Sequence, residues 1–245
     1  MRHAIPFVCL LLLTLAGPAL AQEVDLNAPG RRPAEIARDA SSKPVEVLEW
    51  IDLDSGAAVA DLYAGSGYHS WIFSQWVGPE GVVFSQSARL PDSLKARIES
   101  GDMATGNVVY VATIQELPDD SLDLVFTDRN YHDIPEERVV EVLAEIKKKL
   151  KPEGLFVVID ARAAEGRDKE AHRIADAVII AEVTGAGFEL VESSEMLANP
   201  ADDHVGGDFE SRDTLDRSLL KFQKPEAEDE ESGGGSTGHG SHASD

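Results

Sequence analysis

Cysteine is nearly absent from this sequence of 245 residues, and basic residues are scarce. The one cysteine, Cys9, lies in an apolar N-terminal run, so the chain beyond it can form no disulfide, cysteine-ligated metal site or thiol nucleophile. Lysine and arginine number 22 against 45 acidic residues, which gives a formal net charge of −23. Nucleic acids and anionic membranes bind clustered basic residues, so this balance argues against both as partners. A small-molecule substrate or a cationic partner is compatible with it.

Long apolar runs are also missing, since none beyond the N-terminus approaches the ~18 residues of a membrane-spanning helix. The N-terminal run, Ala4 to Leu15, follows Arg2 and His3 and is too short to span a bilayer. It leads to Ala19-Leu20-Ala21, which is typical of a signal-peptide cleavage site. We therefore predict that residues 1–21 are a signal peptide, that the exported chain begins at Gln22, and that it is periplasmic or secreted without a membrane span. An uncleaved anchor is the alternative.

At the other end, residues 226–245 contain no apolar side chain larger than alanine. Such a segment buries nothing that offsets the entropy cost of ordering it, so residues 225–245 are predicted to be a disordered acidic and Gly/Ser-rich tail. Its two histidines, His239 and His242, could touch a metal, but this composition is more typical of a linker. Between signal and tail, residues 22–224 carry 21 basic and 39 acidic residues, a charge of −18.

The whole chain is 42% hydrophobic, which is enough for a core. Between signal and tail, short apolar runs alternate with helical patterns. The expected strands are 57–62, 82–84, 108–111, 122–126, 155–159, 188–191 and 218–222. The expected helices are 33–50, broken at 41–44 with Ser41 or Ser42 near the second N-cap, then 68–76, 135–150 and 169–183. This alternation predicts an α/β domain over residues 57–224, a doubly wound, mostly parallel open sheet with helices on both faces, preceded by a helical entry segment over 22–56. One of the last two strands is expected to run antiparallel.

In such a sheet, ligands bind outside the carboxyl ends of the strands, where the strand order reverses. The first strand ends at Asp61 and leads into Ala64-Gly65-Ser66-Gly67, which places small residues where backbone must approach a ligand. A Gly-x-Gly turn alone also joins many strands to helices without any ligand, and both interpretations stay open on this motif.

A wider set of motifs carries a family resemblance. Asp61 with Gly65-Ser66-Gly67, then Val77 to Val83, Glu116 to Pro118, Leu122 to Val125 and Leu150 to Gly154 occur in this order over residues 43–223. This order resembles that of class I S-adenosylmethionine-dependent methyltransferases, whose fold is Rossmann-like. Arg38-Asp39, Lys43 to Leu48, Asn130 to Asp133 and His172 to Ile174 are similar to a bacterial group of exported, methyltransferase-like proteins.

The resemblance implies that S-adenosylmethionine is the cofactor and a small molecule the substrate. It implies that Asp61, Ala64, Gly65 and Gly67 line the methionine part, that Gln86 and Ser87 face the ribose, and that Thr113 and Ile114 flank the adenine. Asp128, at the end of the fourth strand, then lies near the transferred methyl group.

The chain departs from that family's pattern at three of these positions. Tyr63 stands where the loop commonly has its first glycine, Gln86 or Ser87 where an acid pairs with the ribose, and Thr113 where an acid often meets the adenine. Loss of a charged partner costs on the order of 1.5–3 kcal/mol. A non-catalytic binding protein with the same fold is therefore the alternative to an exported methyltransferase, and a protein that binds partners through its acidic surface is a third hypothesis.

For catalysis, His132 is the candidate base because imidazole titrates near neutral pH; its neighbours Tyr131 and Asp133 complete the candidate set, with Asp133 expected to orient the ring. A structural histidine that caps the next helix is the alternative. Asp160 ends the fifth strand and is expected at the same sheet edge as Asp61.

Two further groups are expected to be structural. Arg173 is expected in an ion pair, and Asp202-Asp203-His204 in a polar loop. No group of residues shows recognisable metal-ligand spacing, so no metal site is predicted.

Overall fold

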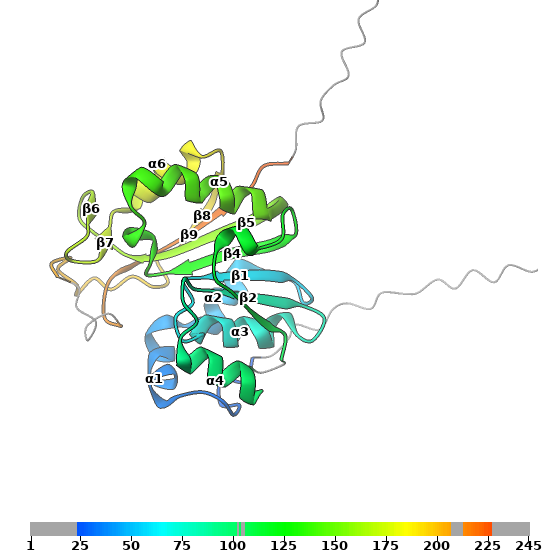
Figure 1. The fold of residues 1–245 in the computed structure, drawn as a ribbon. Coiled ribbons are helices and arrows are strands. Elements are labelled where there is room, and N and C mark those ends of the chain that lie inside the picture. Colours follow the sequence, from blue (N-terminus) through cyan, green and yellow to red (C-terminus); the bar gives the residue numbers. More distant parts are fainter. Residues whose placement is uncertain (1–23, 102, 104–105, 207–212, 227–245) are drawn as a thin grey trace, which may run out of the picture.

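The computed structural model describes residues 24–101, 103, 106–206 and 213–226 (Figure 1). The predicted signal peptide and nearly all of the predicted tail lie outside these residues. No helix in the described part of the chain is long and apolar enough to cross a membrane.

Seven strands form one sheet in the order β3-β2-β1-β4-β5-β9-β8. Their bounds are β1 Ala58–Leu62, β2 Val82–Gln86, β3 Val108–Val111, β4 Leu122–Asp128, β5 Leu150–Ala161, β8 Glu189–Ser193 and β9 Arg217–Gln223. The first five are parallel to one another, and β9 runs antiparallel to both β5 and β8. A short separate pair, β6 Arg167–Asp168 and β7 Arg173–Ile174, extends beyond the main sheet (Figure 1). The predicted fold class, with one antiparallel strand near the end, is confirmed.

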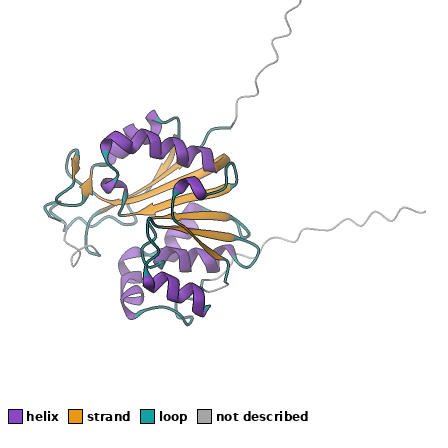
Figure 2. Cartoon of the chain, viewed as in Figure 1, coloured by secondary structure: helices purple, strands orange, loops and turns teal. Residues whose placement is uncertain are grey.

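Helices cover both faces of the sheet (Figure 2). Their bounds are α1 Pro33–Ser42, α2 Pro44–Ile51, α3 Tyr68–Val77, α4 Asp92–Ser100, α5 Val139–Lys149 and α6 Asp176–Gly185. Single turns of 3-10 helix occur at Ile114–Glu116, Tyr131–Asp133 and Glu136–Arg138. In Figure 1, α5 and α6 lie over one face, and α1 to α4 lie on the other side.

The two apolar layers follow from the alternation of side chains along each strand. On β4, Leu124 and Phe126 pack with Trp71 of α3 in one core cluster. Val125 points the other way and packs with Leu143 of α5 in the second cluster. Because both faces of the sheet are covered in this way, the central strands read as nearly continuous apolar runs.

The helices differ from the prediction in three places. The N-cap position of α2 is Lys43, in the left-handed conformation, one residue after Ser42. The helix predicted from 169 starts only at Asp176, because Arg173 is drawn into a buried pair with Asp202 and belongs to β7. The chain also forms α4, which was not predicted.

The omission of α4 has a simple cause. Only Leu94 and Arg97 of this helix are buried, so it lacks the apolar period that marks the others.

The chain order makes the space between β1 and β4 the switch point of the sheet. From β1 the chain moves outward to β2 and β3, then returns to β4 on the other side of β1. Ligand sites in doubly wound sheets lie at the carboxyl ends of the two strands that flank such a point. Here those ends are Leu62 of β1 and Asp128 of β4.

Candidate functional site

The turn after β1 takes an unusual backbone path. Tyr63, Gly65 and Gly67 all have positive φ, at 54°, 55° and 82°. A non-glycine residue is strained there, yet Tyr63 occupies the position at which the related motif commonly has glycine. Gln86 supports the turn from β2, since its side-chain Oε1 accepts the Tyr63 N–H at 3.2 Å and its backbone oxygen accepts the Ala64 N–H at 2.8 Å. The path of the loop is thus maintained without the first glycine.

The two glycines of the turn have different surroundings. A Cβ added to Gly67 would lie 2.8 Å from Leu94 Cδ1, so this residue serves the packing of α3 against α4. A Cβ on Gly65 would meet nothing closer than the Tyr63 carbonyl oxygen at 4.0 Å, and Gly65 borders a cavity. Gly65 is therefore the glycine that leaves room for a ligand.

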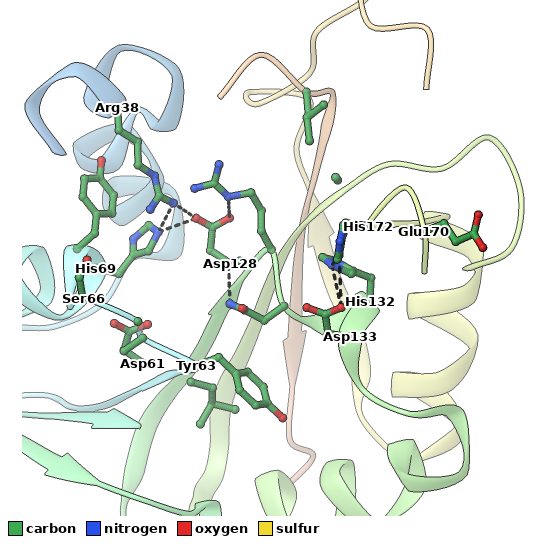
Figure 3. Close-up of a pocket in the computed structure, with 18 of the residues that line it drawn as sticks. Arg38, Asp61, Tyr63, Ser66, His69, Asp128, His132, Asp133, Glu170 and His172 are labelled. Atoms are coloured by element: carbon green, nitrogen blue, oxygen red, sulfur yellow. Dashed lines mark hydrogen bonds and ion pairs between the residues drawn. The ribbon is translucent and has the colours of Figure 1, made fainter. Parts of the chain in front are cut away.

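A cavity of about 770 Å³ opens at this switch point (Figure 3). That volume is within the range of small-molecule and cofactor sites. The residues that line it come from the end of β1 and its turn, the end of β4 and the turn after it, the end of β5, α1, α3, the segment before β7 and two positions before β9. They are Arg38, Asp61, Leu62, Tyr63, Ala64, Gly65, Ser66, Tyr68, His69, Asp128, Arg129, Asn130, His132, Asp133, Ala161, Glu170, His172, Gly206 and Leu215.

Asp61 lies on the β1 side of the cavity and is almost fully buried. Its Oδ2 accepts a hydrogen bond of 2.6 Å from the Ser70 hydroxyl. Burial raises the pKa of Asp61 to about 7, and the nearby Asp128 adds to that rise, while the Ser70 hydrogen bond opposes it. A buried carboxyl group of this kind gains most from a cationic ligand group, which would favour its ionised form.

Asp128 lies opposite, at the end of β4, and holds three elements together. Its Oδ2 accepts hydrogen bonds from Arg38 of α1 and, at 2.8 Å, from His69 of α3. Arg129 Nε lies 3.6 Å from the other carboxylate oxygen. Burial raises the pKa of Asp128, but these neighbours outweigh burial and hold it well below its usual range. Asp128 is thus an ionised carboxylate whose Oδ2 is hydrogen-bonded twice, while its buried Oδ1 has only the charge of Arg129 near it.

His132 follows β4 in a 3-10 turn and is held by Asp160 of β5. The Asp160 carboxylate accepts the His132 backbone N–H at 2.9 Å and lies 2.7 Å from His132 Nδ1. The opposite ring nitrogen, Nε2, lies 3.3 Å from His172 Nδ1 and 3.4 Å from Asp133 Oδ1 (Figure 3). The predicted orienting role of Asp133 is therefore wrong: Asp160, fully buried, orients the ring, and a lone pair on Nε2 can accept a proton or bind a metal ion.

The structure brings together part of the predicted site. Of the predicted cofactor and catalytic residues, the cavity is lined by Asp61, Ala64, Gly65, Asp128, His132 and Asp133. Tyr131 does not line it, because its ring is buried and its hydroxyl donates to Glu182 Oε2 at 2.9 Å. Arg173 forms the expected ion pair, with two guanidinium nitrogens each 2.9 Å from Asp202.

The residues predicted on the ribose and adenine side lie outside the cavity lining, along the ends of β2 and β3. Gln86 uses its amide nitrogen on the Ala112 carbonyl at 2.9 Å, so both ends of its side chain contact backbone. Ser87 is buried, and its carbonyl accepts the Tyr110 hydroxyl at 2.9 Å. Thr113 caps the 3-10 turn that contains Ile114.

His69 was not predicted from the sequence, and Arg38 entered only through a family resemblance. His69 directly follows the Gly-x-Gly turn and Tyr68, and that position was its one sequence signal. Arg38 lies 90 residues before Asp128, so no local pattern shows their contact. In the fold, α1 packs over the turn after β1, where Arg97 joins Glu35 of α1 to the Ser66 carbonyl.

Comparisons with known proteins agree with this fold. Residues 33–117, about a third of the chain, match the family model of Protein-L-isoaspartate(D-aspartate) O-methyltransferase (PCMT). A search among curated proteins found no match.

Many solved structures match the fold at low sequence identity. An S-adenosylmethionine-dependent methyltransferase from Aquifex aeolicus has TM-score 0.60 and 19% identity, covering 76% of this chain and 92% of that one. A 1,6-didemethyltoxoflavin-N1-methyltransferase from Burkholderia thailandensis, with bound S-adenosylhomocysteine, has TM-score 0.55 and 17% identity, covering 82% and 94%. A possible exported protein from Bordetella parapertussis has TM-score 0.55 and 17% identity, covering 80% and 70%.

The chain therefore has the fold of the class I S-adenosylmethionine-dependent methyltransferases, as the order of its motifs predicted. The cofactor predicted from the sequence is the one for which the Aquifex aeolicus protein is named.

Proposed function

We propose that this protein is an S-adenosylmethionine-dependent methyltransferase whose cofactor binds in the cavity between β1 and β4. The observation that carries the proposal is the buried carboxyl group of Asp61 beside an open left-handed turn at the switch point of this fold. Asp61 would accept hydrogen bonds from the ammonium group of the cofactor, and Gly65 would allow the methionine part to approach the backbone. Gln86, Ser87, Thr113 and Ile114 stay predictions for the ribose and adenine end.

The acceptor would bind at the other end of the cavity, near His132 and Asp133. Methyl transfer from a sulfonium is an in-line displacement, so the protein must hold the acceptor about 3–3.5 Å from the methyl carbon. His132 Nε2 is presented by a ring that Asp160 holds from behind, which suits a role next to the reacting acceptor atom. The acceptor is proposed to be a small molecule, since the cavity has the volume of a small-molecule site.

Calorimetric titration of the chain with S-adenosylmethionine, followed by detection of S-adenosylhomocysteine, tests the proposal. His132→Asn retains an N–H donor for Asp160 and removes Nε2, so we expect cofactor affinity to stay unchanged and turnover to fall about 10²–10⁴-fold. Equal loss of binding and turnover in this variant would contradict a role at the acceptor end.

The same titration decides the alternative, a non-catalytic binding protein of this fold. Gln86, whose amide contacts only backbone, offers no carboxylate to the ribose, and this observation favours the alternative. Binding of the cofactor by the wild-type chain without product, across a panel of acceptors, would support it. Absence of binding at millimolar cofactor would refute both.

We also propose that the protein is exported after removal of residues 1–21. The proposal is supported by the short apolar run before Ala19-Leu20-Ala21. In addition, one protein of similar structure is described as a possible exported protein. N-terminal sequencing of protein recovered from outside the cytoplasm should begin at Gln22. An intact Met1 on that protein would contradict cleavage.

A further inference from the structure

Three side chains at the acceptor end of the cavity direct ligand atoms at one point (Figure 3). His132 and Asp133 come from the 3-10 turn after β4, and His172 directly precedes β7. His132 Nε2 lies 3.3 Å from His172 Nδ1, and Asp133 Oδ1 lies 3.4 Å from the first nitrogen and 3.5 Å from the second. Two nitrogens and one oxygen thus form a nearly equilateral triangle.

The edges of this triangle match a tetrahedral metal site. With zinc-to-nitrogen and zinc-to-oxygen distances of about 2.0–2.1 Å, two ligands of a tetrahedral ion lie about 3.3–3.4 Å apart. Two neighbouring ligands of an octahedral magnesium ion lie closer, at about 3.0 Å, and magnesium prefers oxygen ligands. Two imidazoles and one carboxylate are a donor set for zinc or another divalent transition metal.

With the His132 proton on Nδ1, hydrogen bonding satisfies at most one of the three edges of the triangle. The Asp160 carboxylate accepts N–H groups from the backbone of His132 and of Ala161 and lies 2.7 Å from His132 Nδ1. In the tautomer that donates Nδ1–H to Asp160, His132 Nε2 carries a lone pair. The Asp133 oxygen is also an acceptor, and His172 Nδ1 can supply at most one proton for the three edges.

The surroundings hold the triangle in place. Asp160 behind His132 reproduces the carboxylate–histidine–metal arrangement that orients metal ligands in proteins. Arg167 donates to the carbonyls of Tyr131 and His132, both at 3.0 Å, and pairs with Glu182, which fixes the 3-10 turn. His172 has φ of 54°, a left-handed conformation that directs this exposed residue toward His132.

We propose that His132, Asp133 and His172 bind a divalent transition-metal ion, with zinc as the probe, through three protein ligands. The fourth position of the ion would open into the cavity, as in zinc sites that act on a substrate. No such site was predicted from the sequence, because the third ligand lies 40 residues from the first.

The ion would define the acceptor as an oxygen compound, an inference that rests on the proposed function. A bound zinc ion lowers the pKa of its water to about 7, so a metal-bound hydroxyl can lose its proton to solvent. The resulting oxyanion would form the new bond to the methyl carbon, while the carbon–sulfur electron pair stays on sulfur and leaves a neutral thioether.

Zinc titration of the chelator-stripped chain, in competition with a chromogenic chelator and without cofactor, tests the site. The background carries His239→Asn and His242→Asn, which removes the tail histidines. We expect one zinc ion per chain and an affinity at least tenfold lower in His132→Asn, Asp133→Asn and His172→Ala, and about 10–100-fold lower in Asp160→Asn. Glu170→Gln, a cavity residue outside the triangle, is the matched control and should bind zinc like wild type.

Cobalt provides a second readout. Four-coordinate Co²⁺ absorbs visible light intensely, and this band should appear in wild type and be absent in His172→Ala, whose exposed position spares the fold. Unchanged zinc affinity in His172→Ala and His132→Asn, or no zinc binding by wild type at micromolar concentrations, would overturn the proposal. Cofactor binding is titrated separately, without metal. Its outcome tests the proposed function and does not depend on whether zinc binds.

Discussion

We expect Asp61→Asn to lose affinity for S-adenosylmethionine while the protein becomes more stable than wild type at pH 8. The charged hydrogen bond to the cofactor ammonium is worth on the order of 1.5–3 kcal/mol, so its loss should weaken binding roughly ten- to hundredfold. Asparagine keeps the shape of the side chain and an oxygen that accepts the Ser70 hydroxyl.

The gain in stability follows from the raised pKa of Asp61. Burial brings this pKa from 3.8 to about 7, so between these values the folded state binds more protons than the unfolded state. The free energy of unfolding of wild type therefore decreases as pH rises from about 4 to 7, and the cost remains at higher pH. Asparagine has no charge to bury, so we expect Asp61→Asn to be more stable at pH 8 by on the order of 2–4 kcal/mol.

Calorimetry and urea unfolding from pH 4 to pH 8 measure both effects. Asp123→Asn is a matched control, because Asp123 is the second residue of β4, at the end of the strand away from the cavity, where it pairs with Lys151 and accepts the Ala58 N–H. This variant should bind cofactor like wild type. A loss of both affinity and stability in Asp61→Asn would mean that Asp61 serves the fold and not a ligand.

Asp128→Asn is expected to destabilise the protein by about 3–5 kcal/mol, because it leaves two buried guanidinium groups without their carboxylate. Arg38 approaches it from α1 and Arg129 from the end of β4. His69 of α3 is a neutral hydrogen-bond partner near pH 7, since burial lowers its pKa to about 4. The low pKa of Asp128 gives the sign of the pH effect: its contribution is present above about pH 4 and is lost as pH falls through the folded-state pKa. The variant should therefore differ most from wild type near neutral pH.

Urea unfolding at pH 7 and pH 3 measures this difference. Glu141→Gln is the matched control, since the Arg138–Glu141 pair is exposed and should change stability by less than about 1 kcal/mol. A change of similar size in Asp128→Asn would contradict the structural role. Such a result would restore the interpretation of Asp128 as a residue that serves mainly the ligand.

Local pattern was sufficient for most of the fold. The apolar runs of β1, β4 and β5 predicted central strands because both faces of the sheet are covered, and the three- and four-residue spacing of Val139, Leu143 and Ile146 predicted α5. The polar helix α4 was missed because the prediction relied on apolar spacing. It buries only Leu94 and Arg97, so its sequence shows no helical repeat of apolar residues. Tertiary contact decided the start of α6, where burial of Arg173 against Asp202 replaced a predicted helical turn with β7.

The site divides in the same way. The sequence by itself determined the turn after β1 and its acid, Asp61, because a strand end followed by small residues is a local feature. The partners of the other polar groups lie 28 to 90 residues away: Asp160 behind His132, His172 beside it, and Arg38 against Asp128. Their meeting depends on the strand order, which brings the carboxyl ends of β1, β4 and β5 to one edge, where α1 reaches the end of β4 through Arg38. Ionisation, orientation and ligand geometry at this edge were therefore decided only by the tertiary structure.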